Sequence, residues 1–431
     1  MKGGVSNITN LVILSFTIFF VANIPEVILA RRIGLFPYQF YVAAIVIFSS
    51  LVVFSGVFLK IPQRTLYVIG WFVLLTVSCL LSLLVVSGDA VALNSVKNIC
   101  SFTLISITFS WCLVDAKRIH IGCVGVLIAV ILSVVATFIE FFNADVKFLA
   151  DVMWETGIKE GVAQRVTGLH GNANANAYAM ALGLFIGQLV LPKSVRFLFT
   201  LIVGLAVVTT ASRSGMTLWV FVFLASAFIG LYGKGFSILR LLSLLFVLLL
   251  VVLLVSGQLP AIIEGLGLSE YMPKDALDRF SSGFISQSDG SAQARLGVAA
   301  FLFEQFTNNP IFGVGLGQSG GEVSEFGLAS HNMALRMASE MGIIGLLVYT
   351  SLLLVPIFTK NPFGFIFVSL YFFMNMFTNT SIDKPIFAIL IPLACLYLSE
   401  KQTKRKRKRR RAKHSDGRRS YEHKGVAVNS R

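Results

Sequence analysis

The sequence predicts an all-α protein that crosses a membrane many times, and three observations support this fold class. Hydrophobic residues make up 56% of the 431 residues, and the mean hydropathy is +0.80. Charged residues account for only 13%, compared with about 25% in soluble proteins. The apolar residues also fall in runs close to the roughly 20 that an α-helix needs to cross a bilayer. We therefore expect one polytopic membrane domain over residues 1–399 and no sizeable water-soluble domain.

About twelve apolar runs are candidate transmembrane helices. In chain order they cover approximately residues 8–30, 40–59, 66–87, 94–114, 121–143, 175–191, 197–211, 216–232, 237–256, 340–359, 364–378 and 385–399. The first run is too long for the apolar core of a signal peptide, so we expect it to be retained. The longest polar insertion is the loop 257–339, and any chemistry is expected there.

Basic residues in the short connections predict the orientation of the chain. They recur on alternate connections, on the same side as the C-terminal tail: Lys60, Arg64, Lys117, Arg118, Lys193, Arg196, Lys234 and Lys360. Positive loops stay in the cytoplasm, so both termini are expected inside and the loops 144–174 and 257–339 outside. Arg31 and Arg32 follow the first run on the outer side and conflict with this rule. Both outer loops are long enough to carry short amphipathic helices on the membrane surface.

The strong positive charge belongs mainly to the C-terminal tail. Residues 400–431 hold 14 Lys or Arg and 3 acidic residues, which accounts for +11 of the net charge of +15. A basic run directly after a membrane helix is typical of the cytoplasmic side and binds anionic lipid. Nucleic-acid binding is the weaker alternative. We expect a disordered tail whose partner is membrane lipid and not nucleic acid.

Four arginines on the predicted outer side are candidate ligand contacts. Arg213 lies in a tight connection between two apolar runs, where an ionisable group is a functional candidate. Its guanidinium matches phosphate oxygens, although a snorkelling arginine is the alternative. Arg165, Arg279 and Arg295 lie in the outer loops, and each alone is typical of a solvated helix face or an ion pair. Together they favour an anionic ligand such as a phosphate or diphosphate.

His331 is the candidate proton acceptor. It lies near the expected start of a helix, where Ser330 or Asn332 can act as the N-cap. A single histidine at a membrane edge is more often structural than catalytic. His331 is nevertheless the only histidine in the long loop, and imidazole titrates close to neutral pH. Arg336 and Glu340 follow it at helical spacing and can form an ion pair.

Alternating asparagines precede the run at 175–191. One of Asn172, Asn174 and Asn176 can cap the helix, but capping does not account for three. The others are candidates for hydrogen bonds to sugar hydroxyls. His170, just before them, is a second candidate acid or base.

Metal-ligand and nucleotide motifs are absent from the sequence. It contains no His-x-x-x-His, Cys-x-x-Cys or Asp-x-Asp pattern, so we expect no metal and no cofactor. The glycines at 313, 315 and 317 lack the Lys-Ser/Thr of a phosphate loop, so we interpret them as a flexible turn after Pro310. The five cysteines lie in or beside apolar runs, and neither a disulfide framework nor a thiol nucleophile is expected.

Several of these motifs together resemble the O-antigen ligase and O-antigen polymerase superfamily. The resemblance is strongest over about 165–350. It is carried by Ser212-Arg213-Ser214-Gly215, Asn309-Pro310 through Gly313-Val314-Gly315, His331-Asn332 with Glu340, Gly342 and Gly345, and Gly171-Asn172-Ala173-Asn174. The last of these is similar to the family's Gly-Asn-Pro-Asn element, with Ala173 in place of Pro.

The resemblance implies a glycosyltransferase at the periplasmic face of a bacterial inner membrane. The implied donor is an oligosaccharide on undecaprenyl diphosphate. The implied acceptor is either another lipid-linked unit, as in a polymerase, or the lipid A core, as in a ligase; we favour the polymerase. Other polysaccharide-assembly proteins are possible partners. The expected catalytic residues are His331, Arg213 and Arg295, and the expected substrate-binding residues are Asn172, Asn174, Arg279, Asn332 and Arg165.

A transporter or flippase of lipid-linked glycans is the alternative from another class. Such a protein would place charged residues near the midplane of a central cavity. Here the candidate residues collect toward one face, which favours glycosyl transfer.

Overall fold

The computed structural model describes residues 2–25, 27, 61–85, 90–143, 146, 148, 165–231, 261, 264–265, 290–319, 332–378 and 381–397, and the fold is reported for these residues. They form α-helices and short 3-10 helices, without a strand in the described part of the chain. In chain order the helices are α1 (Lys2–Val21), α4 (Gln63–Val85), α5 (Ala90–Cys112), α6 (Ala116–Phe142), η3 (Gly168–His170), α8 (Ala173–Gly187), α9 (Lys193–Thr209), α10 (Arg213–Phe228), α14 (Gly290–Asn308), α15 (Met333–Thr350), η5 (Ser351–Leu353), α16 (Leu354–Phe358), α17 (Pro362–Asn375), η6 (Ser381–Asp383) and α18 (Pro385–Leu396).

The all-helical architecture agrees with the sequence prediction, and a helix occupies each expected span that lies on described residues. Three helical stretches are long and apolar enough to cross a membrane: Gln63–Leu83, Ala116–Phe142 and Met333–Phe358. Shorter apolar helices cover Asn7–Val21, Arg213–Phe228, Pro362–Asn375 and Pro385–Leu396. The expected spans 40–59 and 237–256, the tail 400–431 and much of the loop 257–339 lie outside the described residues. The total of about twelve spans therefore stays a prediction.

The first helix is interrupted within the expected span 8–30. Helix α1 ends at Val21, and helical backbone resumes at residues 24, 25 and 27. The cause is Asn23, whose backbone is left-handed (φ 53°) and whose side-chain amide donates to the Leu169 carbonyl at 3.0 Å. Asparagine tolerates this conformation better than most residues. A distant loop therefore holds the interruption at Asn23, which hydropathy alone does not reveal.

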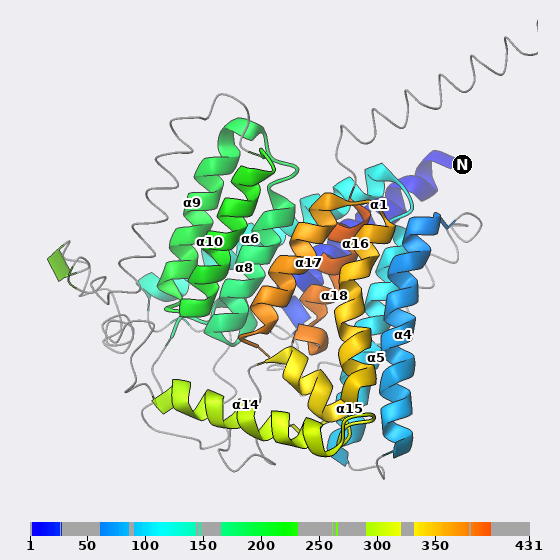
Figure 1. The fold of residues 1–431 in the computed structure, drawn as a ribbon. Coiled ribbons are helices and arrows are strands. Elements are labelled where there is room, and N and C mark those ends of the chain that lie inside the picture. Colours follow the sequence, from blue (N-terminus) through cyan, green and yellow to red (C-terminus); the bar gives the residue numbers. More distant parts are fainter. Residues whose placement is uncertain are drawn as a thin grey trace, which may run out of the picture.

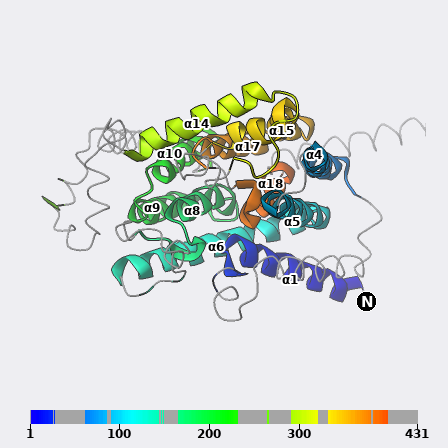
Figure 2. The same cartoon turned by 90° about the horizontal axis from the view of Figure 1, so that it is seen from below.

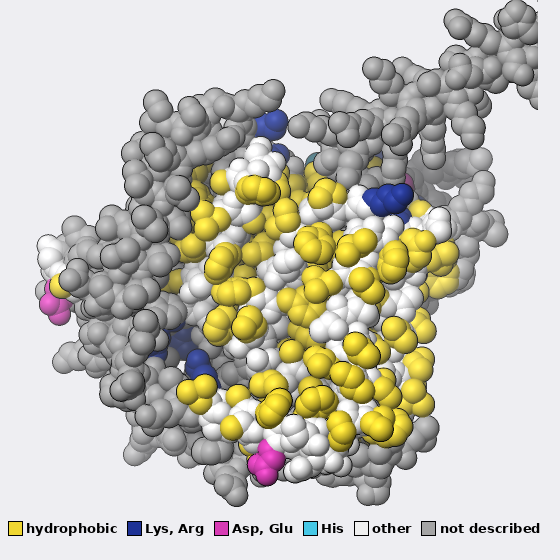
Figure 3. Space-filling view, in the orientation of Figure 1, with side chains coloured by type: hydrophobic (Ala, Val, Ile, Leu, Met, Phe, Trp, Pro, Cys, Tyr) yellow, Lys and Arg dark blue, Asp and Glu magenta, His cyan; other side chains and the backbone are white. Residues whose placement is uncertain are grey.

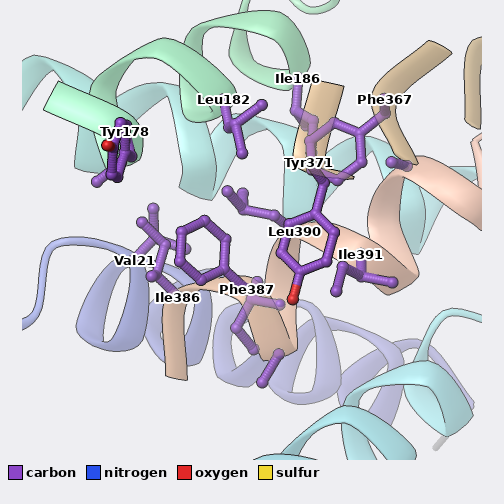
Figure 4. Packing of buried hydrophobic residues seen from close by; sticks show 14 of the residues in the cluster. Val21, Tyr178, Leu182, Ile186, Phe367, Tyr371, Ile386, Phe387, Leu390 and Ile391 are labelled. Atoms are coloured by element: carbon purple, nitrogen blue, oxygen red, sulfur yellow. The ribbon is translucent and has the colours of Figure 1, made fainter. Parts of the chain in front are cut away.

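Helices α8 and α18 form the centre of the bundle (Figure 2). Every side chain of α18 is buried, and so are nearly all those of α8. A helix that is apolar on all sides is expected in such a position. In Figure 4, Leu182 and Ile186 of α8 lie close to Tyr371 of α17 and to Phe387 and Leu390 of α18. These contacts hold the central helices to their neighbours.

The outer surface of the bundle is largely apolar. In Figure 3 hydrophobic side chains cover the middle of the visible face, and Lys, Arg, Asp and Glu side chains lie toward its edges. Large exposed hydrophobic side chains include Leu74, Leu80, Leu205, Leu347, Phe358 and Phe365. A soluble protein rarely exposes so continuous an apolar surface. Contact with lipid accounts for it.

Helix α14 runs across one end of the bundle and not along it (Figures 1 and 2). Its buried residues Val298 and Leu302 lie on the side that packs against the bundle, where α14 contacts α15. The helices α8, α10, α15 and α18 begin at this same end. We call it the α14 end of the bundle.

A break inside α15 depends on a glycine. Gly342 has φ 65° and ψ −159°, a conformation that only glycine adopts readily. A Cβ atom at this position would lie 2.2 Å from the Ile311 carbonyl oxygen. The backbone of the turn after α14 therefore lies directly against the broken helix, where no side chain fits.

Three backbone hydrogen bonds join this turn to the break. They run from Val314 N–H to the Ser339 carbonyl (2.8 Å), from Gly315 N–H to the Glu340 carbonyl (3.0 Å) and from Ile343 N–H to the Pro310 carbonyl (2.8 Å). In an unbroken helix these groups of α15 would bond within the helix. The turn thus satisfies the polar groups that the break releases. The glycine-rich segment is the turn after Pro310 that the sequence predicts, and its backbone is docked and hydrogen-bonded.

We predict that Gly342→Ala destabilises the protein, whereas Gly70→Ala does not. The added methyl group at position 342 meets backbone atoms and forces a strained conformation, which alone costs about 1–3 kcal/mol. Gly70 lies in α4, and a Cβ atom there would have no neighbour within 4 Å. Thermal unfolding of both purified variants in the same detergent measures the difference. Equal melting temperatures would contradict the proposed role of the break.

Candidate functional site

Arg213 is the first residue of α10 and is half-buried at the α14 end of the bundle. Ser212 precedes it as the N-cap, and the Ser212 hydroxyl accepts a hydrogen bond from Gly215 N–H at 3.1 Å. No acidic residue lies in the first turn of α10. A cation at this position faces the positive end of the helix dipole, so helix stability does not explain the arginine.

The small residues beside Arg213 serve helix packing. A Cβ atom at Gly215 would lie 2.3 Å from the Cβ atom of Ala177 on α8. The Ser214 and Tyr178 hydroxyl groups form a hydrogen bond of 2.6 Å between the same two helices. The small residues of this segment thus let α10 approach α8 closely.

Asn174 joins two segments of the site. Its side-chain oxygen accepts hydrogen bonds from Arg165 Nη2 at 3.1 Å and from Ser212 Oγ at 2.7 Å. Arg165 Nε also donates to the Thr210 carbonyl at 3.3 Å. The side-chain amide of Asn174 thus links the segment that carries Arg165 to the start of α10. Arg165, Asn174 and Arg213 therefore lie close together at the α14 end of the bundle.

Arg295 reaches the same place from α14. It is an exposed residue, and both Arg295 and Arg165 interact electrostatically with the buried Tyr178 hydroxyl. In Figure 3 Lys and Arg side chains gather between the lower end of α10 and α14. The structure therefore brings together arginines from three separate segments. We call Arg165, Asn174, Ser212, Arg213 and Arg295 the basic cluster.

The remaining asparagines have separate partners. Asn172 is exposed and caps α8, accepting from Asn174 N–H at 2.9 Å and Ala175 N–H at 3.2 Å. Asn176 is buried and donates to the Thr137 hydroxyl at 2.9 Å. Each alternate asparagine thus has its own structural partner, which the sequence pattern did not predict.

The expected helix start after His331 is confirmed in part. Asn332 caps α15, and its side-chain oxygen accepts from Leu335 N–H at 3.1 Å. Arg336 and Glu340 form the expected ion pair, 3.2 Å apart and almost completely buried. Glu340 also accepts a hydrogen bond from the Ser319 hydroxyl. His331 and Arg279 lie outside the described residues, so their roles remain predictions.

Two functional contributors were missed in the sequence. Tyr178 follows Asn174 by four residues, so the two share one face of α8, and this spacing was the available signal. Glu140 lies near the end of an apolar helix, where an ionisable residue is itself a signal. The buried Glu140 carboxylate accepts from Thr167 N–H at 3.1 Å and Gly168 N–H at 2.7 Å. It thereby holds the loop that presents Arg165.

His170, the second candidate acid or base, lies in the short helix η3 that follows Arg165 in the chain. It is the last residue of η3 and is buried. It borders a cavity lined by Asn23, His170, Ala175, Lys384, Pro385, Ile386 and Phe387.

Fold and cluster together define an α-helical membrane protein with a positively charged, hydrogen-bonding site at one end of the bundle. Residues 198–350 match the family described as O-antigen ligase, which confirms the resemblance to the O-antigen ligase and polymerase superfamily. The matched residues include Arg213, Arg295 and Asn332, whereas Arg165 and Asn174 precede the matched region. No curated protein matches the chain.

We predict that Asn174→Leu destabilises the protein by about 1–3 kcal/mol, because two hydrogen-bond donors, one of them charged, lose their acceptor. Asn172→Ser is the matched control, since serine retains the N-cap and should change stability by a few tenths of a kcal/mol, about 0.2–0.5. Thermal unfolding in detergent measures both. If the two variants have the same melting temperature, the hydrogen bonds of the Asn174 side chain do not hold the cluster together.

Proposed function

We propose that the protein is a glycosyltransferase that moves an oligosaccharide from undecaprenyl diphosphate to a sugar hydroxyl. The family match supports glycosyl transfer of the O-antigen ligase or polymerase type. The observation that carries the proposal is the basic cluster. Its Asn174 oxygen holds Arg165 and Ser212 beside Arg213, and Arg295 and Arg165 both interact electrostatically with the Tyr178 hydroxyl.

The electrostatics of this end of the bundle favour an anionic ligand. Helices α8, α10, α15 and α18 all begin here, and none has an acidic residue in its first turn. Each helix start carries a partial positive charge of about +0.5. The guanidinium groups add full charges and can donate two parallel hydrogen bonds to phosphate oxygens. A diphosphate satisfies both features.

In the proposed reaction the acceptor hydroxyl oxygen attacks the anomeric carbon of the donor sugar. The bond from that carbon to the phosphate oxygen breaks, and undecaprenyl diphosphate leaves with the electron pair. Arg213 and Arg295 stabilise the growing negative charge on the diphosphate. His331 accepts the proton of the hydroxyl. A single displacement inverts the anomeric carbon, and the leaving group makes a nucleotide or metal unnecessary.

The other candidate residues have supporting roles in this proposal. Arg165, held by Asn174, adds a further charge beside the diphosphate. Arg279, Asn172 and Asn332 contact the sugars or phosphates of the substrates. The acceptor that we favour is a second lipid-linked repeat unit, which makes the protein a polymerase. A ligase that uses the lipid A core is the alternative with the same cluster.

The proposal places the reaction at the periplasmic face of the inner membrane, with both termini in the cytoplasm. There the basic tail binds anionic lipid and is available to assembly proteins. Transport of lipid-linked glycans is less well supported. The described members of the cluster lie at helix starts and on a transverse helix, whereas a transporter site is expected near the bilayer midplane.

The glycan pattern of cells that lack this protein tests the proposed activity. For a polymerase we expect loss of the ladder of long chains, with one repeat unit still attached to its acceptor. For a ligase we expect loss of every attached repeat, with polymer retained on the carrier lipid. Gel electrophoresis of surface and carrier-linked glycan measures both. An unchanged pattern would reject glycosyl transfer.

We predict that Arg213→Ala and His331→Ala abolish long-chain glycan without changing the amount of membrane-inserted protein. Arg213→Lys should also be poorly active, because an ammonium group cannot reproduce the two-pronged contact of guanidinium. Lys193→Ala, at the exposed start of α9, is the control. The measurements are glycan electrophoresis and immunoblotting of membranes. Normal chains in an Arg213 or His331 variant would exclude that residue from the reaction.

A further inference from the structure

Helix α14 has two faces that differ in their surroundings. Successive residues turn by about 100°, so Leu296 and Phe303, seven residues apart, lie within about 20° of each other. These two side chains are 72% and 57% exposed, whereas Val298 and Leu302 on the opposite side are 2% and 1% exposed. The helix therefore packs one apolar face on the bundle and leaves a second apolar stripe uncovered.

The uncovered stripe continues into the turn that follows. Ile311 is 57% exposed and Phe312 is 50% exposed. Their turn is bonded to the break in α15 through Ile343 N–H and the Pro310 carbonyl. Ile343 and Leu347 on α15 are also exposed, at 40% and 60%. The apolar surface of α14 is thus continuous with the lipid-facing surface of α15.

We propose that α14 lies in the plane of the membrane interface, with Leu296, Phe303, Ile311 and Phe312 inserted in lipid. The transverse direction of α14 at the edge of the bundle supports this position (Figures 1 and 2). An interfacial helix buries its apolar face about 5–10 Å into the boundary between headgroups and acyl chains. The occupant of the stripe is therefore membrane lipid, and a second copy of the chain or another protein is an outcome that the test can detect.

This position has a consequence for Arg295. The residue lies about 260° around the helix from Leu296, next to the packed face and away from the exposed stripe. A helix seated at the interface holds this guanidinium at the depth of lipid phosphates. The anion that meets Arg295 then belongs to a molecule anchored in the membrane and not to a soluble phosphate. This consequence supports the proposed function, but the position of α14 does not depend on it.

A fluorescent label at position 303 tests the proposal. The full-length Phe303→Cys variant is labelled with an environment-sensitive maleimide and reconstituted in phospholipid vesicles. Quenching is compared between a nitroxide on the lipid acyl chain and aqueous iodide. Leu347→Cys serves as the lipid-exposed control and Ser194→Cys, at the start of α9, as the water-exposed control. Wild-type protein treated in parallel gives the background from native cysteines.

We expect the label at position 303 to behave like that at 347, with stronger quenching by the lipid nitroxide than by iodide. Leu296→Cys should give the same result and provides a second position if the first variant inserts poorly. Stronger quenching by iodide, as at 194, would overturn the proposal. Protection from both quenchers would also overturn it, because protein would then cover the stripe. Since no glycan product is measured, failure here is distinct from failure of the proposed function.

Discussion

The backbone hydrogen bonds at the break in α15 determine how the α14 end of the bundle is built. Within a bilayer, unpaired peptide groups cost several kcal/mol each, so irregular backbone persists only where protein satisfies it. The turn after α14 supplies these partners, and Gly342 leaves room for it. The position of α14 follows from this docking. Arg295, on that helix, can approach the Tyr178 hydroxyl because α14 is held there.

A second set of bonds holds the other side of the cluster. Glu140 anchors the loop after residue 165 through two backbone N–H groups, and Asn174 then receives both Arg165 and the N-cap Ser212. Charge-assisted bonds of this kind are stronger than neutral ones. Two helices and one loop therefore share a single amide oxygen. Arg165 is thus held in place within the fold, and under the proposed function such a fixed guanidinium stabilises charge in the transition state at little reorganisation cost.

Sequence reasoning predicted the helices well and the contacts between them poorly. Hydropathy located the helical spans because burial in lipid or in the bundle requires apolar runs, and Asn332 was found because capping is a local interaction. The interruption at Asn23 and the docking of the glycine turn were not predicted, because both depend on partners far away in the chain. The hydrogen bond between Arg165 and Asn174 was not predicted, and Glu140 and Tyr178 were overlooked. Their roles come from tertiary contacts and not from their neighbours in sequence.

The two buried carboxylates of the described chain bear on which group can accept a proton. Glu140 accepts backbone N–H groups, and Glu340 is paired with Arg336 and Ser319. The oxygens of both carboxylates are therefore already occupied by hydrogen-bond partners within the fold. The basic cluster itself contributes guanidinium, amide and hydroxyl groups, none of which accepts a proton readily at neutral pH. Imidazole titrates close to neutral pH, and under the proposed function His331, which immediately precedes the Asn332 cap of α15 in the sequence, is the group that accepts the proton.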